Sequence, residues 1–214
     1  MQIINYQKEL DKLIKKIEQG TDEKAPTLFL HSCCAPCSSY VLKYLRKYFA
    51  ITVFYYNPNL DSEEEYNLRM SEQKRFISQY EYAEDTEFVE IGYENDDFEK
   101  AIKGLENQPE GGARCFVCYR LRMEKTAEYA KNNGYDYFAT TLTVSPLKNA
   151  EKINAIGFEL GKKYGIKYLP TDFKKRNGYA KSVELSKEYG LYRQNYCGCK
   201  YGKAESNLIN NNVN

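Results

Sequence analysis

Short apolar runs alternate with helix-like segments along most of this chain, and this order constrains its fold more than any other feature. Runs suited to buried strands occupy 27–31, 51–56, 87–91, 135–140 and 166–169. Segments typical of amphipathic or solvated helices occupy 3–19, 39–49, 61–80, 117–132 and 149–164. Strands that alternate with helices predict an α/β fold, in which a parallel sheet carries helices on both faces.

Length and composition indicate one folded domain. At 214 residues the chain can form one sizeable core, and its 42% hydrophobic and 14% aromatic residues exclude wholesale disorder. We expect a single domain over 1–206 and a disordered, Asn-rich tail over 207–214. No apolar run approaches the roughly 20 residues needed to cross a bilayer, and the N-terminus lacks the order of a secretory signal. The expected protein is cytoplasmic and has no membrane partner.

The seven cysteines fall into three short clusters, and none is used singly elsewhere. The clusters are Cys33, Cys34 and Cys37, then Cys115 and Cys118, then Cys197 and Cys199. A cysteine used only for packing behaves as a small hydrophobe, so packing alone would scatter seven of them. Inside a cell thiols stay reduced, and clustered thiols indicate metal binding or redox catalysis rather than a disulfide framework.

The first cluster directly follows the first predicted strand, at the turn into a helix. Ligands of open α/β sheets bind outside the carboxyl ends of the strands, so topology alone makes this turn a candidate site. A nucleotide-binding turn would be rich in glycine, whereas residues 31–39 contain none. Thiolates suit a soft metal instead, and the N-terminus of the helix is expected to lower their pKa values.

The second cluster, Cys115-x-x-Cys118, opens a predicted helix. This spacing is compatible with zinc, iron–sulfur and thioredoxin-like redox sites. Joined by two thiols of the first cluster, the pair would supply the four sulfurs of a closed site. Adjacent Cys33 and Cys34 make a poor zinc knuckle, because neighbouring side chains are expected to diverge. The ligand pattern therefore favours an iron–sulfur cluster over zinc, and zinc over a metal-free arrangement.

The third cluster places two thiols, Cys197 and Cys199, around a single glycine. A disulfide between them would close a small, strained ring that is easily reduced. This property suits a redox switch better than a structural staple. The alternative is a pair of surface thiols near the end of the chain with no chemical role.

The net charge of +1 is unevenly divided, because 13 Lys and Arg face only 6 Asp and Glu from Thr141 onward. Tyrosines are interleaved there with Lys174, Lys175, Arg176, Lys181, Arg193, Lys200 and Lys203. Cations that meet phosphates and rings that stack on unpaired bases are typical of a nucleic-acid surface. A solvated helix face is an equally weighted alternative.

Five motifs occur in a specific order. They are His31-Ser32-Cys33-Cys34-Ala35-Pro36-Cys37, Tyr55 to Asn59, Ala113 to Arg122, Thr140 to Pro146, and Tyr196 to Cys199. Together, from about residue 27 to about residue 201, they resemble the QueH-type epoxyqueuosine reductase family. The resemblance implies a fold like the adenine-nucleotide hydrolase-like (HUP-like) α/β proteins, without their phosphate-binding loop. It also implies the last step of queuosine synthesis, in which an epoxide on the wobble base of tRNA is reduced to an alkene and the oxygen leaves as water.

The resemblance further implies cofactors, a partner and site residues. Cys33, Cys34, Cys115 and Cys118 would hold a 4Fe-4S cluster, Cys37 would bind a second, mononuclear iron, and Cys197 and Cys199 would be a redox-active dithiol. The partner would be the tRNA anticodon loop, and an electron donor is required that the sequence does not identify.

Epoxide deoxygenation needs two electrons, two protons and a group that polarises the C–O bond. A cluster held by four cysteines binds substrate poorly, so the second iron is the expected oxygen acceptor and the cluster the electron carrier. His31, the single histidine, is a candidate proton donor, although a structural hydrogen bond at the end of a buried strand is favoured. Asp61, Tyr119 and Ser145 are polar residues near strand ends with no assigned role.

Two rival functions use the same features. One is a zinc-stabilised tRNA-binding module without redox activity, which would be colourless, whereas an iron–sulfur protein is brown. The other is an ATP-dependent tRNA sulfurtransferase, which would need the glycine-rich first turn that residues 31–39 do not supply.

Overall fold

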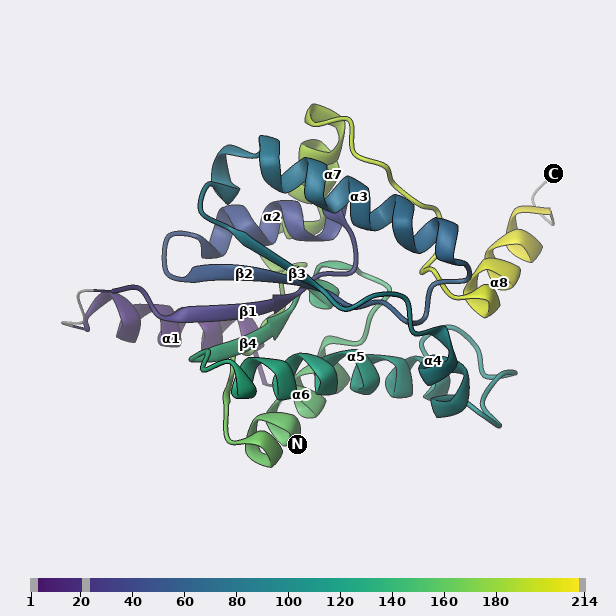
Figure 1. The fold of residues 1–214 in the computed structure, drawn as a ribbon, viewed down its shortest axis with the longest axis horizontal. Coiled ribbons are helices and arrows are strands. Elements are labelled where there is room, and N and C mark those ends of the chain that lie inside the picture. The colour runs from purple at the N-terminus through teal and green to yellow at the C-terminus, as the bar shows by residue number, and fades with distance from the viewer. Residues whose placement is uncertain (1–3, 21–23, 212–214) are drawn as a thin grey trace.

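The centre of the fold is a five-stranded parallel sheet with the strand order β3-β2-β1-β4-β5 (Figure 1). The structure is a computed structural model that describes residues 4–20 and 24–211, with side chains up to residue 208. The strands are β1 (Thr27–His31), β2 (Ala50–Tyr55), β3 (Glu87–Glu90), β4 (Tyr137–Thr140) and β5 (Lys167–Tyr168). All five expected runs form strands, and the predicted parallel α/β architecture is confirmed.

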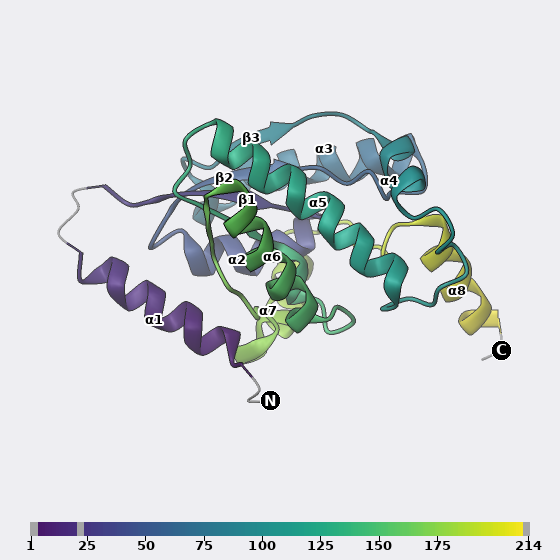
Figure 2. The ribbon, with the colours of Figure 1, turned by 90° about the horizontal axis from the view of Figure 1, so that it is seen from below.

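Helices cover both faces of this sheet. Figure 1 shows α2, α3 and α7 on one side and α5 and α6 on the other. The helices are α1 (Tyr6–Glu18), α2 (Ala35–Leu45), α3 (Glu63–Gln79), α4 (Asn95–Ala101), α5 (Ala113–Asn132), α6 (Ala150–Tyr164), α7 (Gly178–Glu188) and α8 (Lys200–Asn211). The described residues also form three short 3-10 helices: η1 (Glu81–Ala83), η2 (Thr141–Val144) and η3 (Lys175–Asn177). Figure 2 shows α1 and α8 at opposite ends of the molecule.

Alternate residues of the central strands supply two separate apolar layers. Leu28 and Leu30 of β1 pack with α1, α2 and α7, whereas Phe29 packs with α5 and α6. This follows from the pleat of a strand, which points successive side chains to opposite faces. Among the helices of the described residues, none is long and apolar enough to cross a membrane.

The strand register brings three loops together at the carboxyl edge of the sheet. His31, the last residue of β1, is opposite Phe54 of β2 and Thr140 of β4. The order of the strands reverses between β1 and β4, and ligands of open α/β sheets bind at such a switch point. The loop that carries Cys33 and Cys34 therefore lies beside η2, which directly follows β4.

The structure differs from the sequence prediction at several helices. Helices α4, α7 and α8 were not predicted, and α2 begins at Ala35 rather than at 39, because Pro36 fits the first turn of a helix. Helix α8 extends to Asn211 and so includes residues 207–211, which the sequence analysis assigned to the tail. Ala204, Glu205 and Leu208 favour that continuation. Residues 212–214, and residue 3 of the predicted first helix, lie outside the described residues.

Candidate metal centre

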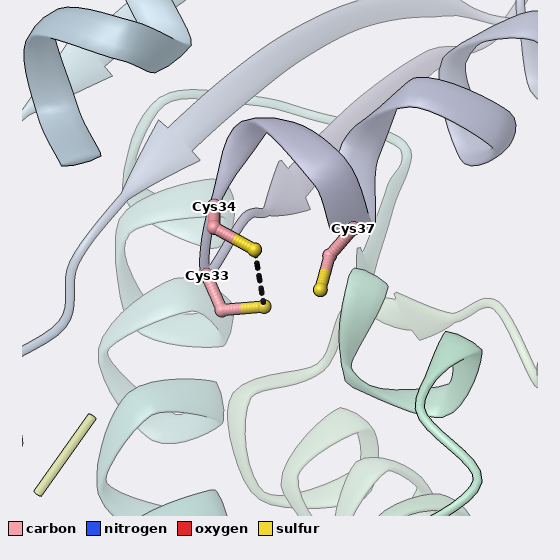
Figure 3. A group of neighbouring side chains, drawn as sticks. All are labelled: Cys33, Cys34 and Cys37. Carbon is pink, nitrogen blue, oxygen red and sulfur yellow. Dashed lines mark hydrogen bonds between the residues drawn. The ribbon is translucent and has the colours of Figure 1, made fainter. Parts of the chain in front are cut away.

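Three thiols converge directly after β1. The sulfur atoms of Cys33, Cys34 and Cys37 all lie within 4.8 Å of one another, and Figure 3 shows them pointing toward a common point. Cys34 is the N-cap of α2, and Cys37 lies one turn later on the same helix face. Thiolates that share one metal at about 2.3 Å must come within roughly 4 Å of each other, so this group fits metal binding.

Contacts among these thiols separate their pKa values. Hydrogen bonds from Cys34 and Cys37 lower the pKa of Cys33 well below its usual range. The contact with Cys33 in turn raises the pKa of Cys34 to about 12, and contacts with both neighbours raise that of Cys37. The lowered pKa of Cys33 therefore comes from its thiol neighbours, and Cys34 and Cys37 at the start of α2 do not show the lowering expected at a helix N-terminus. A group of three sulfurs that shares one negative charge can bind a cation, because a bound metal displaces the remaining thiol protons.

The other four thiols line a second, smaller cavity. Cys115 and Cys118 come from the first two turns of α5, and Cys197 and Cys199 from the segment that leads into α8. Burial raises the pKa of Cys118 to about 12 and also raises the pKa values of Cys115 and Cys199. The structure thus places the expected cluster ligands in two neighbouring groups, Cys33 and Cys34 in one and Cys115 and Cys118 in the other.

Two cations lie between the thiol groups. The guanidinium of Arg122 is buried, donates to the backbone oxygen of Cys118 at 3.4 Å, and keeps one nitrogen, Nη2, without a hydrogen-bond partner in the described structure. The ammonium of Lys148 donates to the Cys197 sulfur at 3.1 Å. Among the described residues, neither cation forms an ion pair with a carboxylate.

Buried charge without a counter-ion is costly, so these cations indicate an anionic neighbour. Thiolates ligated to a metal, or to an iron–sulfur cluster, are anionic and would satisfy both. The residues present therefore fit such a group. Sequence analysis did not single out Arg122 or Lys148, although Arg122 follows Cys118 by four residues, which places both on one helix face.

A cavity of about 280 Å³ opens over the first thiol group. Cys33, Cys34 and Cys37 line it together with Arg122, Lys148 and Cys197. Cys197 and Arg122 also line the smaller cavity, so they connect the two thiol groups. The exposed residues Tyr179 and Arg193 contribute to the larger cavity as well. Its volume is near the lower end for small-molecule sites, and suits one ring of a larger substrate.

The surroundings of His31 indicate a structural role. Its ring is fully buried, with Nδ1 2.9 Å from the Thr140 hydroxyl and Nε2 3.1 Å from the Tyr56 carbonyl oxygen. Burial, assisted by Arg122, lowers the pKa of His31 to about 3. Both ring nitrogens are engaged and the ring does not line the larger cavity, which agrees with the favoured structural role.

The remaining sequence candidates are dispersed. Ser145 lines the larger cavity and Tyr119 the smaller one. Asp61 accepts hydrogen bonds from Tyr196 and Lys203. These contacts assign positions to the three residues, and Asp61 in particular fastens the segment that carries Cys197 and Cys199.

Most of the predicted basic surface is neutralised. Four of its seven cations bind carboxylates, in the pairs Lys174–Asp172, Arg176–Asp11, Lys200–Glu99 and Lys203–Asp61. Arg193 instead lies over the Tyr179 ring, 5.9 Å from its centroid. Lys175, Lys181 and Arg193 form no ion pair among the described residues, and of these three only Arg193 lines the larger cavity.

A family model and the curated relatives agree on one family. A family model described as Epoxyqueuosine reductase QueH matches residues 28–205. A protein of that name from Streptococcus pyogenes serotype M1 is 43% identical over 202 residues, which cover 94% of this chain and 78% of the relative. Another, from Staphylococcus epidermidis, is 40% identical over 217 residues, which cover 100% of this chain and 90% of the relative. A solved phosphoadenylyl-sulfate reductase from Candida auris aligns with 90% of this chain and 91% of its own, with 12% identity and a TM-score of 0.41.

Proposed function

Because the chain belongs to the epoxyqueuosine reductase QueH family, we propose that its thiol-lined cavity reduces epoxyqueuosine in tRNA to queuosine with the help of bound iron. The enzyme is an oxidoreductase of queuosine synthesis. The observation that carries the assignment to this cavity is the convergence of Cys33, Cys34 and Cys37 beneath it, within 4.8 Å of one another.

The proposed metals divide the thiols by role. Cys33, Cys34, Cys115 and Cys118 would hold a 4Fe-4S cluster, and Cys37 an additional iron. The position of the Cys37 sulfur beside two of the cluster thiols supports a second metal adjoining the first. When bound, these groups would supply electrons and a Lewis acid for the epoxide oxygen.

The chain's own residues would hold the substrate and supply charge. The larger cavity is the size of a substituted ring, so the epoxide-bearing ring can enter while the rest of the nucleotide stays outside. Arg122 and Lys148 make the cavity positive, which favours thiolates and stabilises negative charge that develops on the departing oxygen. Cys197 and Cys199 can carry the two electrons that the reaction consumes, as a dithiol that becomes a disulfide.

We place the tRNA at the open side of this cavity. Tyr179 is 42% exposed, and the Arg193 guanidinium lies over its ring. An exposed ring can stack on an unpaired base of the anticodon loop, and the guanidinium beside it can bind a phosphate. Substitution of both by alanine should raise KM for tRNA more than it lowers kcat.

The test is anaerobic reconstitution followed by a mass-spectrometric assay of nucleosides from epoxyqueuosine-containing tRNA, without ATP. We expect brown protein with absorbance near about 400 nm, iron and sulfide in similar amounts, and conversion of epoxyqueuosine to queuosine. Cys33→Ser protein should lose both colour and conversion. Colourless protein that binds zinc and tRNA without conversion would favour the tRNA-binding module, and conversion only with ATP would favour a sulfurtransferase-like reaction.

A further inference from the structure

The two thiols of the C-terminal pair have different surroundings. Cys197 is partly exposed, lines the larger cavity and accepts a hydrogen bond from Lys148. Cys199 is only 7% exposed and does not line that cavity. Its sulfur accepts a hydrogen bond of 3.3 Å from the backbone N–H of Gly202, in the first turn of α8. One sulfur therefore faces the cavity while the other is covered.

Hydrogen bonds hold the segment that carries these thiols in place, so Cys197 stays at the cavity and Cys199 stays covered. The backbone N–H of Asp61 donates to the Gly198 oxygen at 2.9 Å, and the Asp61 side chain binds Tyr196 and Lys203 on either side of the pair. The difference between Cys197 and Cys199 is thus a property of the fold.

Lys148 donates a hydrogen bond to Cys197. It lies between η2 and α6 in the chain, and its ammonium is 3.1 Å from the Cys197 sulfur. Burial opposes its charge, but Cys197, Tyr119 and Cys33 together raise the pKa of Lys148 above its usual range. The ammonium thus donates a charge-assisted hydrogen bond that holds the Cys197 sulfur at the cavity.

We propose that Lys148 is a positioning residue that holds the Cys197 sulfur at the cavity wall, so that Cys197 exchanges electrons with an external dithiol while Cys199 remains the covered partner. This inference rests on the proposed function, in which the pair is redox-active. To that function it adds which of the two sulfurs the external dithiol attacks, Cys197, and the residue that determines this choice, Lys148.

The electrons balance over two exchange steps. A thiolate of the external dithiol attacks the Cys197 sulfur of the oxidised pair, the Cys197–Cys199 bond breaks, and Cys199 leaves and takes up a proton. The second thiol of the reductant then loses its proton and attacks the mixed disulfide, which releases Cys197 beside Lys148. The reductant becomes a disulfide, and the pair gains two electrons, one proton at Cys199 and a second proton when the released Cys197 thiolate is protonated.

The test is the rate at which iodoacetamide alkylates each thiol of the reconstituted, reduced protein, read by peptide mass spectrometry. We expect Cys197 to react faster than Cys199. Lys148→Met should slow Cys197 by about tenfold, the equivalent of one charge-assisted hydrogen bond, and Lys148→Arg should restore most of the rate. Lys152→Met, four residues away on the exposed surface, is the matched control and should leave it unchanged.

Equal rates at Cys197 and Cys199, or a wild-type rate at Cys197 in Lys148→Met protein, would overturn the proposal. Turnover measured with a dithiol reductant distinguishes failure of this proposal from failure of the proposed function. Loss of conversion in both Cys197→Ser and Cys199→Ser proteins supports a redox-active pair. Full conversion in both variants would show that the pair is not needed for the reaction, and the exchange role of Cys197 would fail with it. The proposed function would still hold, because the wild type converts the substrate.

Discussion

The sulfur atoms of Cys33 and Cys34 lie 3.9 Å apart, although the two residues are neighbours in the chain. In a strand, neighbouring side chains point to opposite faces, and the sequence prediction of divergent thiols follows that rule. Here the chain turns from β1 into α2 between them, and the extended backbone of the N-cap Cys34, with φ −175° and ψ 162°, lets both sulfurs face Cys37. The turn brings the sulfurs of adjacent residues together, so that both could bind one metal.

Substitution of Cys37 should separate the two proposed metals. If Cys37 binds the additional iron alone, Cys37→Ser protein will contain less iron but undiminished sulfide, because only the cluster contains sulfide. Cys118→Ser protein should lose both iron and sulfide. The measurement is chemical analysis of iron and sulfide in anaerobically reconstituted variants. Loss of sulfide in Cys37→Ser protein would show that Cys37 belongs to the cluster itself.

Arg122 should set how readily the proposed cluster is reduced. A buried cation stabilises the more negative, reduced state, so Arg122→Gln should shift the cluster midpoint potential downward, by on the order of 60 mV for a tenfold change in a one-electron couple. Arg122→Lys should shift it less. The measurement is a potentiometric titration followed by electron paramagnetic resonance. Arg120→Gln is the control, since Arg120 is exposed and bound to Glu159, and an equal shift in that variant would contradict the local role of Arg122.

The position of the site was predictable from sequence because it depends on periodicity. Apolar runs locate β1, β2 and β4, and parallel strands bring the loops after them to one edge. The helices that escaped prediction, such as α4 and α8, are short or contain asparagines and a glycine, so their sequence carries weak helical spacing. They form because tertiary contacts, such as the Arg114–Glu205 ion pair between α5 and α8, hold them.

The grouping of the thiols was not predictable, because it depends on loop conformation. Cys37 joins Cys33 and Cys34 through the turn into α2, and the segment before α8 brings Cys197 and Cys199 to the cavity that Cys115 and Cys118 line at the start of α5. The contacts of the cations were also not predictable. Nothing in the sequence distinguishes Lys148, which contacts a thiol, from Lys200 and Lys203, which bind carboxylates on the surface.

Asp61 should make attachment of the C-terminal segment dependent on pH. Burial raises the pKa of Asp61, but hydrogen bonds from Lys203 and Tyr196 outweigh it, and the net pKa is lowered. Its stabilising contribution is therefore complete above the unfolded value of about 4, and is lost as the pH falls through the folded value. Asp61→Asn should lower stability by about 1 kcal/mol at pH 7, and the difference from wild type should close at lower pH.

Thermal unfolding of both proteins between pH 7 and pH 3 measures this effect. Glu184→Gln is a matched control, because Glu184 is an exposed carboxylate outside the ion pairs of the described residues. A difference between Asp61→Asn and wild type that stays constant over this range would show that the Asp61 charge does not fasten the segment.

Gly198 should tolerate no side chain, because it combines an unusual backbone angle with a close approach. Its φ is +127°, and an added Cβ would lie 2.6 Å from the Leu60 side chain and 3.1 Å from Arg69. Gly198→Ala should therefore cost about 1–3 kcal/mol of stability through strain and overpacking. It should also reduce turnover, since relief of the clash moves the flanking thiols Cys197 and Cys199.

The Gly190→Ala variant separates backbone strain from overpacking, the two causes of the stability loss expected in Gly198→Ala. Gly190 also has a positive φ, of +57°, but an added Cβ there meets open space, so this variant carries backbone strain of roughly 1–2 kcal/mol without a clash. Comparison of melting temperature and turnover in the two variants isolates the contact with Leu60. If Gly198→Ala and Gly190→Ala proteins turn over substrate equally well, close packing against Leu60 does not position the thiols. If turnover falls only in Gly198→Ala protein, the glycine between the two cysteines is required because no larger residue fits where the pair must lie.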